Sequence, residues 1–267
     1  MSFSRRRVIM GLAFGAFYSP QPAGAIVVRH DTPAARYLAR PDAFPPIADL
    51  PGEGHGVLIA PSWVVTVAHT LTSPAVSEIA VADRARPVAR IILHPEYEPL
   101  SGVEMVGDAA PLMVRLNSLR DIALIELQEP ITDVRPASMY RSGREEGRLV
   151  RILGRGATGT GLEGEPANAP HRGPLRLAYN RIESAAGRWL SYRFDREHRL
   201  EGIQGGGDSG GPVLLRDHGE WKLAGLASWR SWNGDLARFR GGVYGQSAFQ
   251  TRISFYAGWI DGVISAP

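Results

Sequence analysis

Residues 205–212 read Gly-Gly-Gly-Asp-Ser-Gly-Gly-Pro, and this stretch says more about fold and function than any other part of the chain. Its glycines permit positive φ angles, so a plain tight turn is the simplest interpretation. A serine in such a turn is also a candidate nucleophile, but a serine hydroxyl is weak at neutral pH and needs a neighbouring base. Ser209 therefore directs attention to a histidine that can act as the base and a carboxylate that can orient it.

Two upstream segments offer these partners. Residues 64–69 read Val-Val-Thr-Val-Ala-His, and residues 121–125 read Asp-Ile-Ala-Leu-Ile. The chain order is therefore His69, Asp121, Ser209, which is the order of chymotrypsin and not that of subtilisin or the α/β-hydrolases. Taken singly, His69 is equally well a core histidine and Asp121 an ordinary edge carboxylate. Three such motifs in one order are much harder to explain by accident.

With these motifs the chain resembles the trypsin-like serine proteases of the chymotrypsin fold, over nearly everything after residue 25. It looks like an exported, bacterial-type member without cysteines. Residues 56–69 are similar to the family's strand pair leading to its catalytic histidine, and residues 226–229 to the segment lining its substrate cleft. Residues 242–244 and 256–260 resemble its last strand and its C-terminal helix. The resemblance implies a serine endopeptidase that acts on a protein or peptide substrate through an acyl-enzyme.

The resemblance also assigns roles around the nucleophile. It implies that His69, Asp121 and Ser209 are the catalytic residues. The backbone N–H groups of Gly207 and Ser209 would form the oxyanion hole. Ser228 matches the family serine that hydrogen-bonds the aspartate, although an ordinary strand serine is the simpler interpretation of that position.

By the same resemblance, the substrate pocket would include Ile203, Gly206, Trp229, Arg230 and Gly242. Ile203 stands where an aspartate would select arginine or lysine, so tryptic specificity is not expected. Arg230 stands where the family commonly has glycine, and three interpretations of its role are open. It narrows the pocket to small side chains, pairs with an acidic substrate group, or turns to solvent and leaves room for larger apolar groups. We expect small or apolar side chains first and acidic ones second.

The composition limits the possible chemistry. The chain has 267 residues, of which 44% are hydrophobic and 21% charged, with 31 glycines and 20 prolines, which favours a globular fold rich in turns. It has no cysteine, which excludes thiol catalysis and cysteine-ligated metals. Its histidines show no metal-ligand spacing, so we expect no metal and no cofactor. Gly205 stands where the family often has a disulfide cysteine, which predicts a looser pocket wall.

Residues 1–25 resemble a twin-arginine signal peptide. Arg5, Arg6 and Arg7 precede an apolar stretch over 8–18, which is shorter than the about 20 residues of a membrane-spanning helix. Ala-Gly-Ala at 23–25 fits a cleavage site, and a disordered or membrane-anchoring N-terminus is the alternative. Removal of this segment leaves a nearly neutral chain, which argues against a nucleic-acid partner. We expect an exported monomer, periplasmic or extracellular, without stable membrane association.

Cleavage after Ala25 would make Ile26 the N-terminal residue. In the resembled family an exposed Ile-Val terminus inserts its ammonium beside the aspartate that precedes the nucleophile, which is Asp208 here. We therefore expect Ile26 and Asp208 to form an activation pair, so that removal of the signal peptide itself activates the enzyme. Residues 28–29 read Val-Arg where the family usually has Gly-Gly, which leaves a different entry path open.

We expect an all-β fold of two six-stranded antiparallel β-barrels with the active site between them, plus a C-terminal α-helix. The expected parts are the signal peptide (1–25), the N-terminal barrel (26–130), a connector (131–147), the C-terminal barrel (148–250) and the C-terminal helix and tail (251–267). Apolar bursts predict strands at 56–60, 63–67, 88–93, 122–127, 149–153, 176–182, 189–193, 212–215, 222–228 and 243–247. Surface loops are expected at 73–83, 95–110 and 155–172, with 109–114 as a possible strand continuation.

Two other functions stay open beside the endopeptidase. The first is a catalytically silent, trypsin-like binding protein that holds a partner in its cleft. The departures from the family pattern at 28–29 and at Arg230 favour this alternative. The second is an esterase-like or narrow processing role with one natural substrate.

Overall fold

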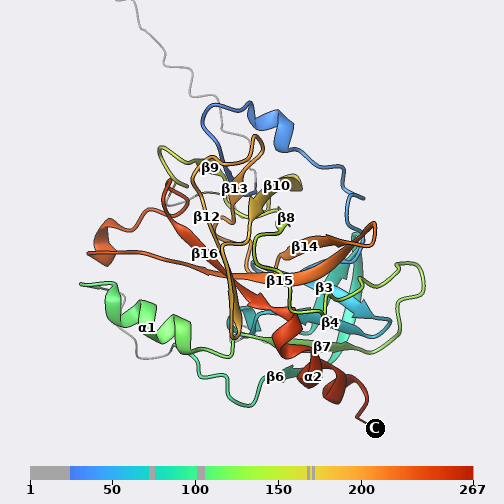
Figure 1. The fold of residues 1–267 in the computed structure, drawn as a ribbon. Helices are drawn as coiled ribbons and strands as arrows, with labels where there is room; N and C mark the ends of the chain where they lie inside the picture. Colours follow the sequence, from blue (N-terminus) through green and yellow to red (C-terminus); the bar gives the residue numbers. More distant parts are fainter. Residues whose placement is uncertain (1–24, 72–75, 101–105, 167–168, 170–171, 267) are drawn as a thin grey trace, which may run out of the picture.

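The computed structural model describes residues 25–71, 76–100, 106–166, 169 and 172–266 (Figure 1). Apart from Ala25, the expected signal peptide lies outside the described residues. Within them, the expected all-β class with a C-terminal helix is confirmed: the strands are joined by two α-helices, α1 (Ala110–Ser118) and α2 (Ile253–Ile264). Among the described residues, neither helix has the length and apolar character needed to cross a membrane.

The first half is a closed six-stranded barrel, with the strands in the order β2-β3-β4-β7-β6-β5 around it. Residues such as Leu58, Val64 and Ile125 are completely buried inside it, in one apolar cluster. β-branched and other apolar residues fit such half-buried, pleated surfaces, which explains why the apolar bursts of the sequence become strands. The strand bounds are β2 (Ile47–Asp49), β3 (His55–Ala60), β4 (Trp63–Thr66), β5 (Glu78–Val81), β6 (Arg84–Leu93) and β7 (Ala123–Leu127).

The second half is a curled seven-stranded antiparallel sheet, in the order β10-β8-β14-β15-β16-β12-β11, where we expected a six-stranded antiparallel barrel. Register shifts in β14–β15 and β15–β16 mark bulges, which bend a sheet. The strand bounds are β8 (Leu149–Gly154), β10 (Arg176–Arg181), β11 (Ser184–Ala186), β12 (Trp189–Arg193), β14 (Pro212–Asp217), β15 (Glu220–Arg230) and β16 (Ser247–Arg252).

A side chain bridges the gap that a closed second barrel would seal with backbone hydrogen bonds. Asn180 of β10 donates from its amide nitrogen to the carbonyl oxygens of Arg193 on β12, at 3.0 Å, and of Gly202, at 3.1 Å. The edge strand β10 therefore meets the segment around Gly202 instead of pairing directly with β12.

A small third sheet ties the N-terminal segment to the second half. Strand β1 (Val27–Val28) lies between β13 (Gly202–Ile203), which is antiparallel to it, and β9 (Gly159–Thr160), which is parallel. The start of the range expected for the first barrel thus pairs with strands of the second half.

Four local expectations were wrong. The loop expected over 73–83 contains β5, and the loop expected over 155–172 contains β9. The possible strand over 109–114 is the start of α1, where Pro111 occupies the first turn and Leu112 is buried. The last strand, expected at 243–247, begins only at Ser247, because Gly242 and Gly245 adopt positive φ angles that extended strands do not have.

The two halves share one apolar core. A single cluster contains Val65 of the barrel and Leu214 of the sheet, together with Ile253, Tyr256 and Ile260 of α2. The C-terminal helix therefore packs against residues of both halves where they meet. It lies near the bottom of the molecule in Figure 1. This shared core holds residues from both halves at fixed separation.

Candidate active site

Three side chains from different elements meet where the two halves join. His69 lies in a 3₁₀ turn (Ala68–Leu71) after β4, Asp121 just before β7, and Ser209 in the turn before β14. His69 Nδ1 is 2.8 Å from Asp121 Oδ2, and His69 Nε2 is 2.8 Å from Ser209 Oγ. These two distances let one proton pass between Ser209 and an imidazole that a carboxylate orients.

Asp121 is held from several directions. The His69 backbone N–H donates to its Oδ1 at 3.0 Å, and the Ser228 hydroxyl donates to its Oδ2 at 2.5 Å. The Thr251 hydroxyl donates to the Asp121 carbonyl oxygen at 2.8 Å. The carboxylate is almost completely buried, so these contacts fix its orientation toward His69.

Charge and burial act in opposite directions on this pair. Burial opposes protonation of His69, but the charge and hydrogen bond of Asp121 outweigh it and raise the pKa of His69 above its ordinary value. Burial alone would raise the pKa of Asp121, but His69 and the Ser228 hydroxyl lower it below its ordinary value. The pair therefore favours an ionised Asp121 beside an imidazole that binds a proton more readily than an isolated histidine does.

Gly207 and Ser209 flank Asp208 in the turn that carries the Ser209 hydroxyl. Gly207 has a φ of 82°, in the left-handed region that favours glycine. Within the described part of the chain, neither the Gly207 nor the Ser209 N–H donates to another backbone group or side chain. Two backbone N–H groups in the turn that carries Ser209 are thus candidate donors to an oxyanion.

Asp208 points away from the hydroxyl into a buried polar site. Its carboxylate accepts from the backbone N–H of Ile26 at 3.2 Å, of Gly156 at 2.7 Å and of Gly205 at 2.8 Å. Burial nevertheless raises the pKa of Asp208. His55, which sequence reasoning missed, lies beside it, with Nε2 3.9 Å from Asp208 Oδ1.

An apolar cavity of about 220 Å³ opens next to Ser209. Of the expected pocket residues, Gly206, Trp229 and Arg230 line it. Ile203 and Gly242 do not: Ile203 is fully buried in β13 opposite Val27, and Gly242 packs against Val27. The other lining residues are Leu112, Met113, Leu116, Gln204, Gly205, Ser209, Ser228, Leu236 and Phe239.

Helix α1 contributes three apolar side chains to this cavity, and the sequence did not reveal it. The segment before it is joined to the loop after β15, because Ala109 N donates to Gly234 O at 2.9 Å and Leu236 N to Gly107 O at 2.7 Å. Two segments from opposite halves are therefore joined next to residues that line the cavity. Helical spacing of Leu112, Met113 and Leu116 was the available signal.

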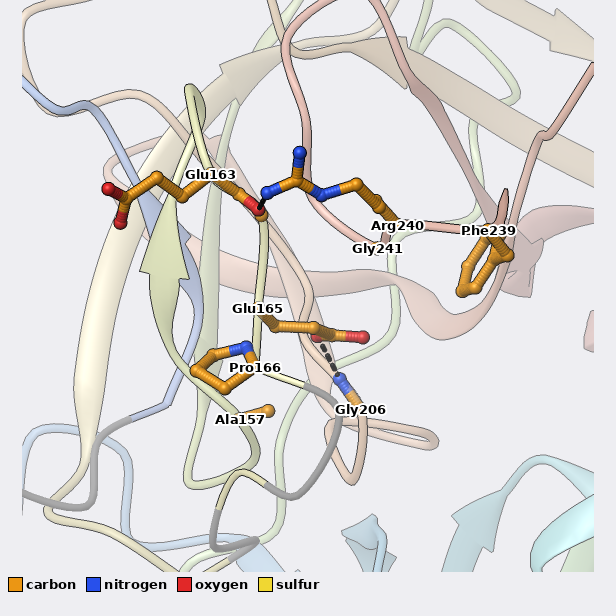
Figure 2. A pocket seen from close by; sticks show the side chains of 9 residues that line it. Ala157, Glu163, Glu165, Pro166, Gly206, Phe239, Arg240 and Gly241 are labelled. Carbon is orange, nitrogen blue, oxygen red and sulfur yellow. Dashed lines mark hydrogen bonds between the residues drawn. The ribbon is translucent and has the colours of Figure 1, made fainter. Parts of the chain in front are cut away.

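Arg230 neither turns to solvent nor stands unpaired. Its guanidinium is paired with Glu165, from the loop expected over 155–172, and its side chain is 11% exposed. Glu165 carries no motif and lies far from Arg230 in sequence, so no local pattern identified it. Glu165 and Gly206 also line a second cavity, of about 630 Å³ (Figure 2).

Comparison with known proteins adds an independent line of evidence. A family model described as Trypsin matches residues 37–260. Vitamin K-dependent protein C of Rattus norvegicus is 28% identical over 233 residues, covering 78% of this chain and 45% of that protein. Coagulation factor XII of Sus scrofa is 31% identical over 254 residues, covering 84% of this chain and 38% of that protein. The chain thus spans less than half the length of these relatives, and both are mammalian, so they do not test the expected bacterial type.

Proposed function

The chain belongs to the trypsin family of serine proteases, and from this premise we propose that it is a serine endopeptidase. The observation that carries the proposal is the unbroken series of contacts from Asp121 through His69 to Ser209. Family membership alone leaves activity open, because function belongs to the site and not to the fold. Here the site holds a nucleophile, a base and an orienting carboxylate within hydrogen-bond distance.

The proposed reaction follows from this geometry. His69 Nε2 takes the Ser209 proton as Oγ attacks the peptide carbonyl carbon, and the oxyanion forms beside the N–H groups of Gly207 and Ser209. His69 then gives the proton to the leaving nitrogen, which leaves an ester on Ser209. A water molecule, deprotonated by His69, hydrolyses this ester and restores the free hydroxyl. Asp121 stays ionised throughout and stabilises the imidazolium.

We also propose that cleavage after Ala25 activates the enzyme. Ile26 has a φ of 61°, a strained value for a β-branched residue, and its peptide N–H already contacts Asp208. Cleavage would release this torsion and turn the amide nitrogen into an ammonium, which compensates a buried carboxylate better than a neutral donor does. Export by the twin-arginine route, to the periplasm or the extracellular space, belongs to the same proposal.

The proposed specificity is non-tryptic, for substrates with a small or apolar side chain. It is supported by the apolar lining from α1, Trp229 and Phe239. The second preference, for acidic groups, loses its support, because Arg230 is already paired within the chain.

Labelling with a fluorophosphonate probe tests this function, since the probe reacts only with an activated serine. The protein to use is 26–267 with a native Ile26 terminus, beside its Ser209→Ala variant and a form that retains residues 1–25. We expect labelling of the first form alone.

The other outcomes are equally informative. Absence of labelling in the 26–267 form would favour the catalytically silent binding protein. Equal labelling of the form that retains residues 1–25 would refute activation by cleavage while leaving the reactive serine established.

A further inference from the structure

Arg230 and Glu165 form a nearly buried ion pair at the edge of the Ser209 cavity. Arg230 Nη2 is 2.6 Å from Glu165 Oε1, and Arg230 Nη1 is 3.1 Å from Glu165 Oε2. The two side chains are only 11% and 13% exposed. Pairing through two parallel bonds fixes the direction of both groups as well as their distance. The charge of Arg230 is thus compensated before any substrate enters.

Glu165 is also tied to two other segments of the site. Its Oε2 accepts from the Gly206 N–H at 2.8 Å, a contact drawn in Figure 2, and its own N–H donates to the Gly241 carbonyl at 2.8 Å. A Cβ at Gly241 would lie 2.3 Å from Glu165 Oε1 and 2.6 Å from Arg230 Nη1. A larger residue at this position would require the ends of the two side chains to shift. Glu165 therefore links Gly206 and Arg230 through its carboxylate, and the segment at Gly241 through its backbone N–H.

The ion pair lies between two cavities. Arg230 lines the apolar cavity at Ser209, and Glu165 lines the larger cavity on the other side, which also contains Glu163 and Arg240. Gly206 and Phe239 line both cavities, so the two spaces are adjacent. The pair joins one residue from each lining and so forms part of the boundary between them.

We propose that the Glu165–Arg230 pair is a partition that sets substrate specificity, an inference that rests on the proposed endopeptidase function. While Glu165 and Arg230 remain paired, the substrate side chain next to the attacked carbonyl enters the apolar cavity at Ser209. This cavity ends at the ion pair, whose two charges compensate each other. A long or charged side chain is excluded, because it would meet the pair or lose its hydration without gaining a partner. Gly205, where the family often has a disulfide cysteine, is next to Gly206, so the ion pair also restrains this wall.

If the pair forms this partition, removing either charge should favour substrate side chains opposite in charge to the one that remains. Glu165→Gln removes the anion that compensates the Arg230 guanidinium at the boundary between the two cavities. Cleavage after Asp and Glu side chains should therefore rise relative to cleavage after Leu. Arg230→Gln leaves the carboxylate, so cleavage after Lys and Arg should rise instead. Each ratio of kcat/KM is expected to change by about tenfold or more, the usual effect of one charge-assisted hydrogen bond.

Two further variants serve as controls. Glu163→Gln removes the same charge two residues away, where the backbone carbonyl of Glu163 and not its carboxylate accepts from Arg240, and should keep the parent order of substrates. The exchange Glu165→Arg with Arg230→Glu restores an ion pair and should return the profile toward the parent.

The rate of fluorophosphonate labelling is a second readout. It separates an effect on substrate specificity from an effect on the position of Gly206. A glutamine at 165 still accepts from the Gly206 N–H, whereas Glu165→Ala cannot, so the rate of fluorophosphonate labelling should fall more in Glu165→Ala than in Glu165→Gln. The experiment profiles a peptide library with all variants and measures labelling in parallel. The proposed partition would be overturned if neither Glu165→Gln nor Arg230→Gln changed the ratios of kcat/KM between substrates while labelling was retained. Loss of labelling in the parent would instead overturn the proposed function.

Discussion

At the scale of single residues, the protonation of His69 depends more on Asp121 than on solvent. Burial lowers the pKa of His69, but the charge and hydrogen bond of the Asp121 carboxylate stabilise the imidazolium and raise this pKa above its ordinary value. Only neutral His69 can accept the Ser209 proton. Activity should therefore appear as pH rises through this raised pKa, which lies above the ordinary histidine value of about 6.5.

Asp121→Asn should lower the pKa of His69 and move the acidic limb of the pH profile to lower pH. It should also reduce kcat by about 10⁴-fold, because the wrong imidazole tautomer becomes favoured. The measurement is kcat/KM, or the labelling rate, against pH. Glu53→Gln is a graded control, because Glu53 raises the pKa of His69 more weakly than Asp121 does. An acidic limb that stays in place in Asp121→Asn would contradict this account of the pair.

At the scale of elements, the connector is tied to the start of α2 by a buried carboxylate. Glu145 is fully buried and accepts from Arg252 Nη2 at 2.8 Å and from the Ser254 hydroxyl at 2.5 Å. Arg252 Nη1 also donates to the Ala185 carbonyl, at 2.8 Å, on β11. The pair thus links the connector, the sheet and the C-terminal helix.

Glu145→Ala should lower the free energy of unfolding by about 3–5 kcal/mol, because it leaves the Arg252 cation nearly buried without its partner. Asp261→Ala is the matched control. It breaks an ion pair with Arg141 that joins the same two elements, but those side chains are 52% and 47% exposed, so the expected loss is about 0–1 kcal/mol. Urea unfolding of both variants makes the comparison, and equal losses would show that burial does not decide the effect.

At the scale of the whole molecule, Gly210 controls how closely the two halves approach at Ser209. It has a φ of 75°, and a Cβ there would lie 1.9 Å from the His55 carbonyl oxygen and 2.5 Å from Thr66 Oγ1. Next to it, His55 N donates to the Ser209 carbonyl at 2.7 Å. The backbone of one half therefore rests directly on the turn that holds the nucleophile of the other.

Gly210→Ala should reduce both stability and labelling of Ser209. Left-handed strain costs about 1–2 kcal/mol, and overpacking adds about 1–3 kcal/mol. Gly219→Ala is the control, since Gly219 has a φ of 85° but nothing within 4 Å of its would-be Cβ. It should show the strain alone and keep full labelling. If labelling of the Gly210 variant equals that of the control, close contact between the halves is not needed to hold Ser209.

The order of the three motifs and most of the strongly apolar strands follow from the amino-acid sequence. The strand over Trp189–Arg193 was predicted to the residue, because its apolar pattern is local. The sequence also named the three side chains that meet at the site, because their motifs are short and distinctive. The seven-stranded sheet, the pairing of β1 with the second half and the Glu165–Arg230 pair became apparent only in the folded molecule. These depend on contacts between residues far apart in the chain, and neither local propensity nor spacing encodes which distant partner a buried charge or a strand edge will meet.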